Sequence, residues 1–209
     1  MRRRLILFPL LLLVFLPVAA QQPSAGSYEL LLEKLKRNDR AIDFKALRVA
    51  YTETKLYSPY GSDREPRKLM FESLHNKAFD KTLENAEKLL LSNYLDLNGH
   101  FGALVAHREL GHAEKFEYHR FVFDGLLNSI KNSGDGKTTP TAMMVISTDE
   151  EYVLLNYLGL RTVKQALINE NGHHYDAMTV VDPKTNQTSV YYFNIDKPFN
   201  WLGNSLKPK

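Results

Sequence analysis

The spacing of apolar residues changes once along the chain, at residues 132–140, and this change constrains the fold more than any other feature. Before it, apolar residues recur at helical spacing, as at Phe123, Leu127 and Ile130. After it, short apolar runs alternate with turn residues, which is typical of β-strands. The stretch itself is rich in Gly, Asp, Thr and Pro. We therefore expect an α+β protein with a helical region at 27–131, a linker at 132–141 and an α+β region at 142–202.

The helical region shows a weak internal repeat. Ser27 and Asp43 are suited to cap its first two helices. Two later segments, which begin at Phe79 and Ala113, lie 34 residues apart and open alike. This is the period of tetratricopeptide repeats, although the diagnostic Trp and Pro are missing. We expect N-terminal helical hairpins that are tetratricopeptide-like.

The C-terminal region predicts a small β-α-β-β-β antiparallel sheet. A short strand at Met143–Ser147 precedes a helix, for which Thr148 and Glu151 form a capping box. Asn171-Gly172 is a strong hairpin signal between two of the later strands. These three strands are expected at Val163–Asn169, Tyr175–Asp182 and Ser189–Ile195.

Polar residues near the end of this sheet form the candidate catalytic set. If the last hairpin turns around Asn186, Asp176 lies opposite Ile195 and close to Asn194 and Asp196. Two carboxylates and an amide on one surface are suited to acid–base or hydrolytic chemistry. The alternative is structural: Asp196 precedes Lys197-Pro198, where Asp commonly caps a turn.

The N-terminal residues have the pattern of a secretory signal peptide. Three arginines precede an apolar run that ends in Ala19-Ala20, so cleavage after Ala20 is expected. Without them, 24 basic residues balance 24 acidic ones, and no nucleic-acid partner is expected. The apolar run contains two prolines and is short for a membrane span, so no membrane anchor is expected after cleavage. The chain has no cysteine and cannot form disulfides.

Neither a cofactor nor a metal is predicted. Gly134–Thr138 resembles the end of a phosphate-binding loop, but Lys131 stands where that motif requires its first Gly. Four histidines are close in sequence, yet their spacings do not place them on one helix face. These are His100, His107, His112 and His119.

Several short motifs together resemble an exported bacterial family, the domain of unknown function 4919. They are Tyr57-Ser58-Pro59-Tyr60, Gly134-Asp135-Gly136-Lys137, the run from Val145 to Tyr152, Gly172 with Tyr175-Asp176, and the run from Tyr192 to Asp196. The resemblance extends from about Asp43 to Trp201 and implies a bacterial, periplasmic setting without a catalytic assignment. It also directs attention to Asp135, Glu151 and Tyr152 as binding candidates.

Two functions compete at this point, beside a purely structural role in the cell envelope, which nothing in the sequence excludes. Stacked helical hairpins form a concave surface, which favours a non-catalytic periplasmic module that binds a protein or peptide. The alternative is a cell-envelope hydrolase that uses Asp176, Asn194 and Asp196. No Ser or Cys nucleophile stands in a known motif, so a hydrolase triad is not expected.

Overall fold

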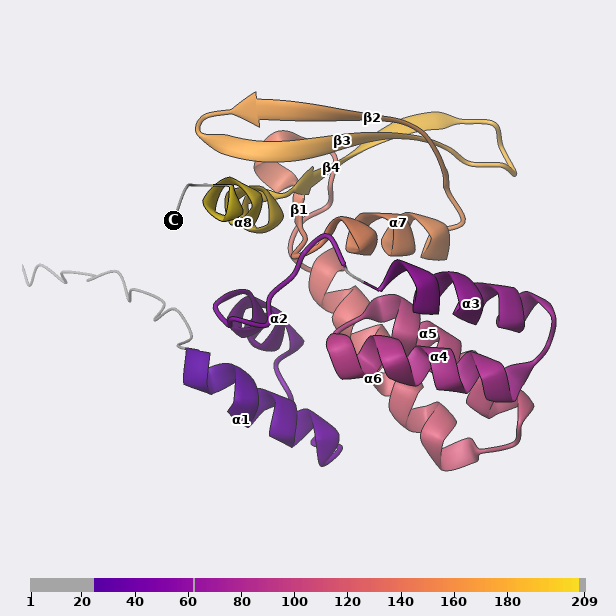
Figure 1. Ribbon diagram of the computed structural model, residues 1–209. Coiled ribbons are helices and arrows are strands. Elements are labelled where there is room, and N and C mark those ends of the chain that lie inside the picture. Colours follow the sequence, from indigo (N-terminus) through magenta and orange to yellow (C-terminus); the bar gives the residue numbers. More distant parts are fainter. Residues whose placement is uncertain (1–24, 62, 207–209) are drawn as a thin grey trace, which may run out of the picture.

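The chain folds into a group of helices followed by a small sheet that carries two further helices (Figure 1). The computed structural model describes residues 25–61 and 63–206, so the expected signal peptide lies outside the described residues. The helical part consists of α1 (Ala25–Lys36), α2 (Phe44–Thr52), α3 (Arg64–His75), α4 (Phe79–Ser92), α5 (Leu97–Glu109) and α6 (Ala113–Lys131). The remainder consists of the 3₁₀ turn η1 (Thr139–Thr141), β1 (Met143–Met144), α7 (Thr148–Tyr157), β2 (Arg161–Glu170), β3 (His173–Val181), β4 (Thr188–Asn194) and α8 (Asp196–Ser205). The expected α+β class is confirmed.

Helices α3 to α6 pack against one another in chain order, as two successive hairpins (Figure 1). The second helices of these hairpins begin at Phe79 and Ala113, at the spacing that the sequence indicates. Helix α3 approaches α5 closely at Gly102, where an added Cβ would lie 2.3 Å from the Sδ atom of Met70. Asp43 caps α2 as predicted, because its Oδ1 accepts a hydrogen bond from the Ala46 amide at 2.9 Å.

The sheet has four strands in the order β1-β4-β3-β2. Strands β2, β3 and β4 form the predicted antiparallel meander, but β1 pairs with β4 in parallel. The prediction of a wholly antiparallel sheet is therefore wrong for β1. A strand of only two residues has no hydrophobic pattern that could specify its partner. In Figure 1 the sheet lies above α1 to α6, with β2 as its uppermost strand.

The register of the last hairpin differs from the expected one by two residues. Asp176 lies opposite Phe193 rather than Ile195. The turn is closed by a hydrogen bond from the Asp182 amide to the Gln187 carbonyl, so its centre lies one position earlier than predicted. Helix α8 was not predicted, because Lys197-Pro198 is typical of a turn as well as of the start of a helix. Pro198 is tolerated there because the first turn of a helix needs no backbone N–H bond.

One cluster of buried apolar side chains connects the helices to the sheet. It includes Leu35 and Leu47 from the first two helices, Leu126 from α6, and Met178 and Phe193 from the sheet. A smaller cluster fills the space between α3, α4 and α5. Across the residues described, no helix is long and apolar enough to cross a membrane.

Candidate functional site

The first turn of α7 joins the helices to the sheet. Four successive residues in this turn each contact a different element, because neighbouring side chains on a helix point about 100° apart. The contacts, in chain order, are Asp149 with Arg67 of α3, Glu150 with Arg48 of α2, Glu151 with Asp176 of β3, and Tyr152 with Gln165 of β2.

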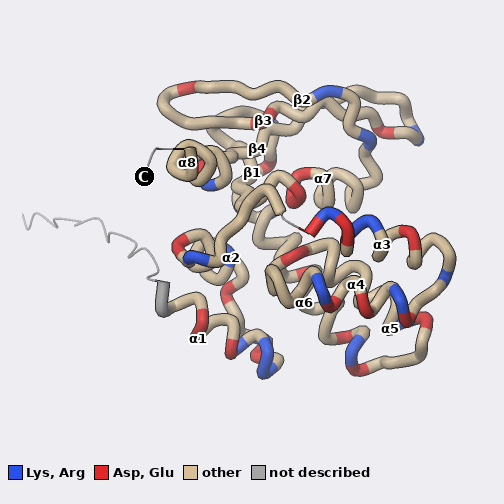
Figure 2. Tube along the Cα trace, in the orientation of Figure 1, with Lys and Arg blue, Asp and Glu red and all other residues tan. Residues whose placement is uncertain are grey.

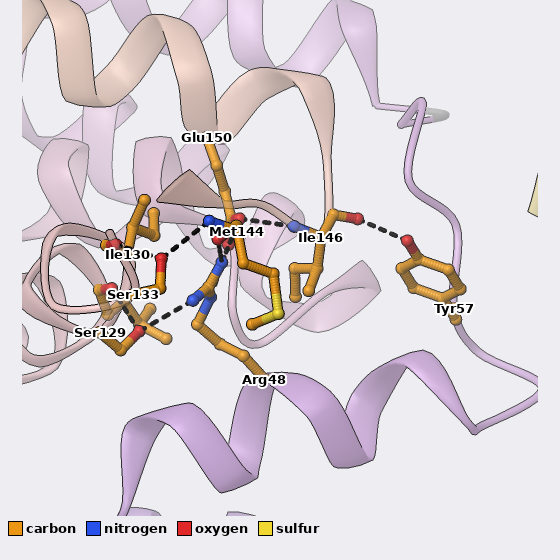
Figure 3. A network of polar contacts seen from close by, with 9 residues as sticks. Arg48, Tyr57, Ser129, Ile130, Ser133, Met144, Ile146 and Glu150 are labelled. Carbon is orange, nitrogen blue, oxygen red and sulfur yellow. Dashed lines mark hydrogen bonds and ion pairs between the residues drawn. The ribbon is translucent and has the colours of Figure 1, made fainter. Parts of the chain in front are cut away.

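The contact between Arg48 and Glu150 is a fully buried ion pair (Figure 3). The Nη2 atom of Arg48 lies 2.6 Å from Oε2 of Glu150, and Nε lies 3.0 Å from Oε1. Arg48 also donates to Ser129 Oγ and to the Met144 carbonyl, while Glu150 accepts from the Ile146 amide. Every charged group is therefore paired, and the pair fixes α2, α6 and β1 against α7.

Glu151 and Asp176 form a pair of carboxyl groups beneath the sheet. Glu151 is fully buried, and neither of its carboxyl oxygens has a hydrogen-bond partner among the residues described. Burial raises the pKa of Glu151 to about 9, and the charge of Asp176 adds to the effect. Burial also raises the pKa of Asp176. At neutral pH the pair therefore holds at least one proton.

Polar side chains lead from this pair towards the surface. The Tyr152 hydroxyl donates to Gln165 Oε1 at 2.8 Å, and Gln165 Nε2 donates to Asp176 Oδ2 at 2.7 Å. Tyr60 lies near both carboxyl groups, and its hydroxyl donates to the Pro198 carbonyl at 3.1 Å. Tyr60 is 38% exposed and Tyr152 is 41% exposed, whereas Asp176 is only 5% exposed. Such a pair can give and take a proton, but in this conformation it is closed to a substrate.

Asn194 and Asp196 lie apart from Asp176, contrary to the arrangement expected from the sequence. Asn194 is on the opposite face of the sheet, because Asp176 is paired with its neighbour Phe193. Asp196 accepts hydrogen bonds from His173 Nδ1 at 2.6 Å, from the His174 amide at 2.8 Å and from Asn194 Nδ2 at 3.1 Å. Burial pushes the pKa of Asp196 up, but these bonds outweigh it and hold the pKa below its usual value.

Asp135 belongs to a separate turn. Its Oδ1 accepts hydrogen bonds from the Lys137 amide at 3.0 Å and from Thr141 Oγ1 at 2.6 Å. Of the six predicted site residues, the structure brings together Glu151, Tyr152 and Asp176, and separately Asn194 and Asp196. Gln165 was missed. The sequence feature that could have identified Gln165 is its place on the same face of β2 as Leu167. An apolar residue would be expected at that position.

The four histidines come together in pairs between α5 and α6. His100 Nδ1 lies 3.0 Å from His119 Nδ1, and His107 Nδ1 lies 3.1 Å from His112 Nδ1. Burial lowers the pKa of His100 to about 4 and that of His119 to about 3, so both are neutral. Within the part of the chain that the structure describes, no three His, Asp or Glu side chains converge on a metal site.

A second candidate site is an apolar cleft of about 400 Å³ between the hairpins and α7. Its volume and apolar lining fall in the range of sites that bind small molecules or single peptide side chains. Phe71 and Tyr157 stand at its rim and are 40% and 55% exposed. The apolar lining residues are Phe71, Phe101, Leu104, Phe123, Val153 and Tyr157.

The polar residues of the cleft are few and largely unpaired. The carboxylate of Asp124 is half-buried and has no ion-pair or hydrogen-bond partner among the described residues. The side-chain amides of Asn98 and Asn156 likewise form no hydrogen bond within the described part of the chain. Arg120, by contrast, is paired with Glu117 at 2.5 Å. An unpaired carboxylate beside an apolar cleft is complementary to a cation next to an apolar group.

Comparisons with known proteins identify a family but no individual relative. No curated protein matches the chain, and no solved structure matches it. A family model, described as domain of unknown function (DUF4919), matches residues 19–202. This match covers α1 to α7, the sheet and the first seven residues of α8. The chain therefore belongs to the DUF4919 family.

Proposed function

We propose that this protein is an exported, non-catalytic binding protein, whose cleft between the hairpins and α7 takes up a peptide segment. The segment would carry a large apolar side chain next to a lysine or arginine. The observation that carries the proposal is the pairing of an apolar cleft with the unpartnered carboxylate of Asp124. The amides of Asn98 and Asn156 are placed to bind the peptide backbone, which offers both donors and acceptors.

Selection from a library of random nine-residue peptides tests this function. Enriched peptides are expected to contain an aromatic or branched apolar residue beside a basic one. Phe71→Ala should weaken all of them by about tenfold, because it removes apolar area at the rim of the cleft. Asp124→Asn should remove the preference for the basic residue and leave the apolar preference. Fluorescence anisotropy with labelled peptides measures both effects.

The matched control is Leu30→Ala, since Leu30 is exposed on α1 and does not line the cleft. It should bind the selected peptides as the unmodified protein does. Selection that enriches no common motif, or peptides that bind Phe71→Ala and Asp124→Asn unchanged, would refute the proposal.

Export is proposed from the sequence pattern of residues 1–20. In support, the family model begins to match at residue 19, so the arginines and nearly all of the apolar run lie outside the matched residues. We expect protein recovered from the periplasm of an expressing bacterium to begin at Gln21. Mass spectrometry of the intact protein measures this. Recovery only from the cytoplasm, with Met1 to Ala20 still attached, would contradict it.

The second candidate function is a cell-envelope hydrolase, and the specific observation in its favour is the proton held by Glu151 and Asp176. The hydrogen bonds of Tyr60 and Tyr152 would have to break before a substrate could reach these two carboxyl groups. Release of soluble fragments from purified cell wall by the protein, but not by Asp176→Asn, would favour this function over peptide binding.

A further inference from the structure

Strand β2 is a long sheet edge whose residues 164–170 pair regularly with β3. It has ten residues and, among the residues that the structure describes, pairs on one side only, with β3 (Figure 1). Edge strands in natural proteins are commonly short, interrupted by proline, or covered, because their free backbone groups can pair with another chain. β2 contains no proline. Leu167, near its middle, is 52% exposed. This edge is therefore suited to pairing with a further strand.

The hairpin between β2 and β3 determines which backbone groups point outwards. Its loop is the two-residue Asn171-Gly172, and both residues have positive φ. In such a hairpin the flanking pair, Glu170 and His173, exchanges both backbone hydrogen bonds. Starting from Asn169 and moving towards the N-terminus, every second residue of β2 therefore points its N–H and C=O away from β3. The outward-pointing residues in the regular part of the strand are Gln165, Leu167 and Asn169.

The same stretch is complementary to itself in one antiparallel register. With Leu167 opposite its own copy, each outward-pointing residue faces another one, as hydrogen bonding requires. Lys164 then lies opposite Glu170 of the second copy, and this contact occurs twice. Ala166 faces Ile168, and Gln165 faces Asn169. The register uses residues 164–170 and leaves out the irregularity between Thr162 and Lys164.

We propose that two copies of this chain pair through β2, antiparallel about a twofold axis at Leu167, and form one continuous eight-stranded sheet. One backbone hydrogen-bond ladder, the Leu167 contact and two Lys164–Glu170 ion pairs would hold the dimer together. Lys164 and Glu170 lie on the face of β2 towards η1, where Thr139 Oγ1 donates a hydrogen bond to Glu170. Both charges are exposed and can reach a second copy, and Figure 2 shows basic and acidic segments along β2.

A charge swap tests the proposed register. In sedimentation velocity from 1 to 500 μM, the unmodified protein should show a concentration-dependent dimer. Lys164→Glu or Glu170→Lys alone places like charges opposite each other twice, and each should raise the dimer Kd at least tenfold. The double variant restores opposite charges and should return the Kd to within threefold of the original. Lys184→Glu, in the turn between β3 and β4, is the control and should leave the Kd unchanged.

A second measurement separates this interface from dimerisation elsewhere. Hydrogen exchange at the amides of Gln165, Leu167 and Asn169 should slow as protein concentration rises, because dimerisation satisfies these N–H groups. Circular dichroism establishes that each variant is folded. A protein that remains monomeric at 500 μM overturns the proposal. A dimer whose Kd is unchanged by both single charge reversals also overturns it, as does a dimer whose β2 amides exchange at a rate independent of protein concentration.

Discussion

Glu150→Ala is expected to lower the free energy of unfolding by about 3–5 kcal/mol, because it leaves the guanidinium of Arg48 buried without its charged partner. Arg48→Ala should cost a similar amount, since it leaves the Glu150 carboxylate with only the Ile146 amide as a partner. The double replacement Arg48→Met with Glu150→Leu should cost much less than the sum, because no unpaired charge then remains in the core. Urea unfolding followed by circular dichroism measures all three.

The matched control is the exposed pair between Lys88 and Glu84 on α4, whose atoms lie 2.7 Å apart. Glu84→Ala should change the stability far less than Glu150→Ala, because water screens an exposed pair. If Glu150→Ala and Glu84→Ala had equal effects, the pair between α2 and α7 would not have the role that Figure 3 suggests.

Glu151 should make the stability of the protein depend on pH in the neutral range. Its pKa is about 9 in the folded protein and 4.5 in an unfolded chain, so unfolding releases a proton between these values. The free energy of unfolding should therefore fall as pH rises from about 5 to 9, by up to about 1.4 kcal/mol per pH unit from this group. The raised pKa of Asp176 acts in the same direction.

Glu151→Gln removes this titration and should flatten the dependence. Between pH 5 and pH 8 the unmodified protein should lose roughly 4 kcal/mol more than the variant does. Urea unfolding at four pH values measures the difference. Glu114→Gln, on the exposed start of α6, should follow the curve of the unmodified protein. Parallel curves for the protein and Glu151→Gln would show that the Glu151 carboxyl does not hold its proton in the folded state.

The helices and the meander could be predicted because their signals are local. Asp43 begins α2, and Asn171-Gly172 joins β2 to β3, as their side chains and backbone preferences dictate. The parallel pairing of β1 could not be predicted, because its partner β4 lies about 50 residues away and two residues specify no register. Helix α8 was missed because Pro198 is compatible with both a turn and the first turn of a helix.

The contacts of the candidate site were likewise hard to predict, because they join residues far apart in the sequence. Glu151 was expected to cap its own helix together with Thr148, but Ser147 precedes the helix and the Glu151 carboxyl is buried next to Asp176. A capping box and a buried acid have the same local sequence, and only the packing of β3 above α7 distinguishes them. The partnership of Arg48 with Glu150, 102 positions apart, has no local signal at all.

The four consecutive contacts at the start of α7 make the length of that segment as important as its composition. Removing Asp149 would delete its contact with α3 and turn the following side chains by about 100° around the helix axis. The contacts with α2, α3, β3 and β2 would then be lost together rather than singly, since they share one geometric reference. Substitutions there weaken one connection each, whereas this single deletion would remove all four polar connections at once.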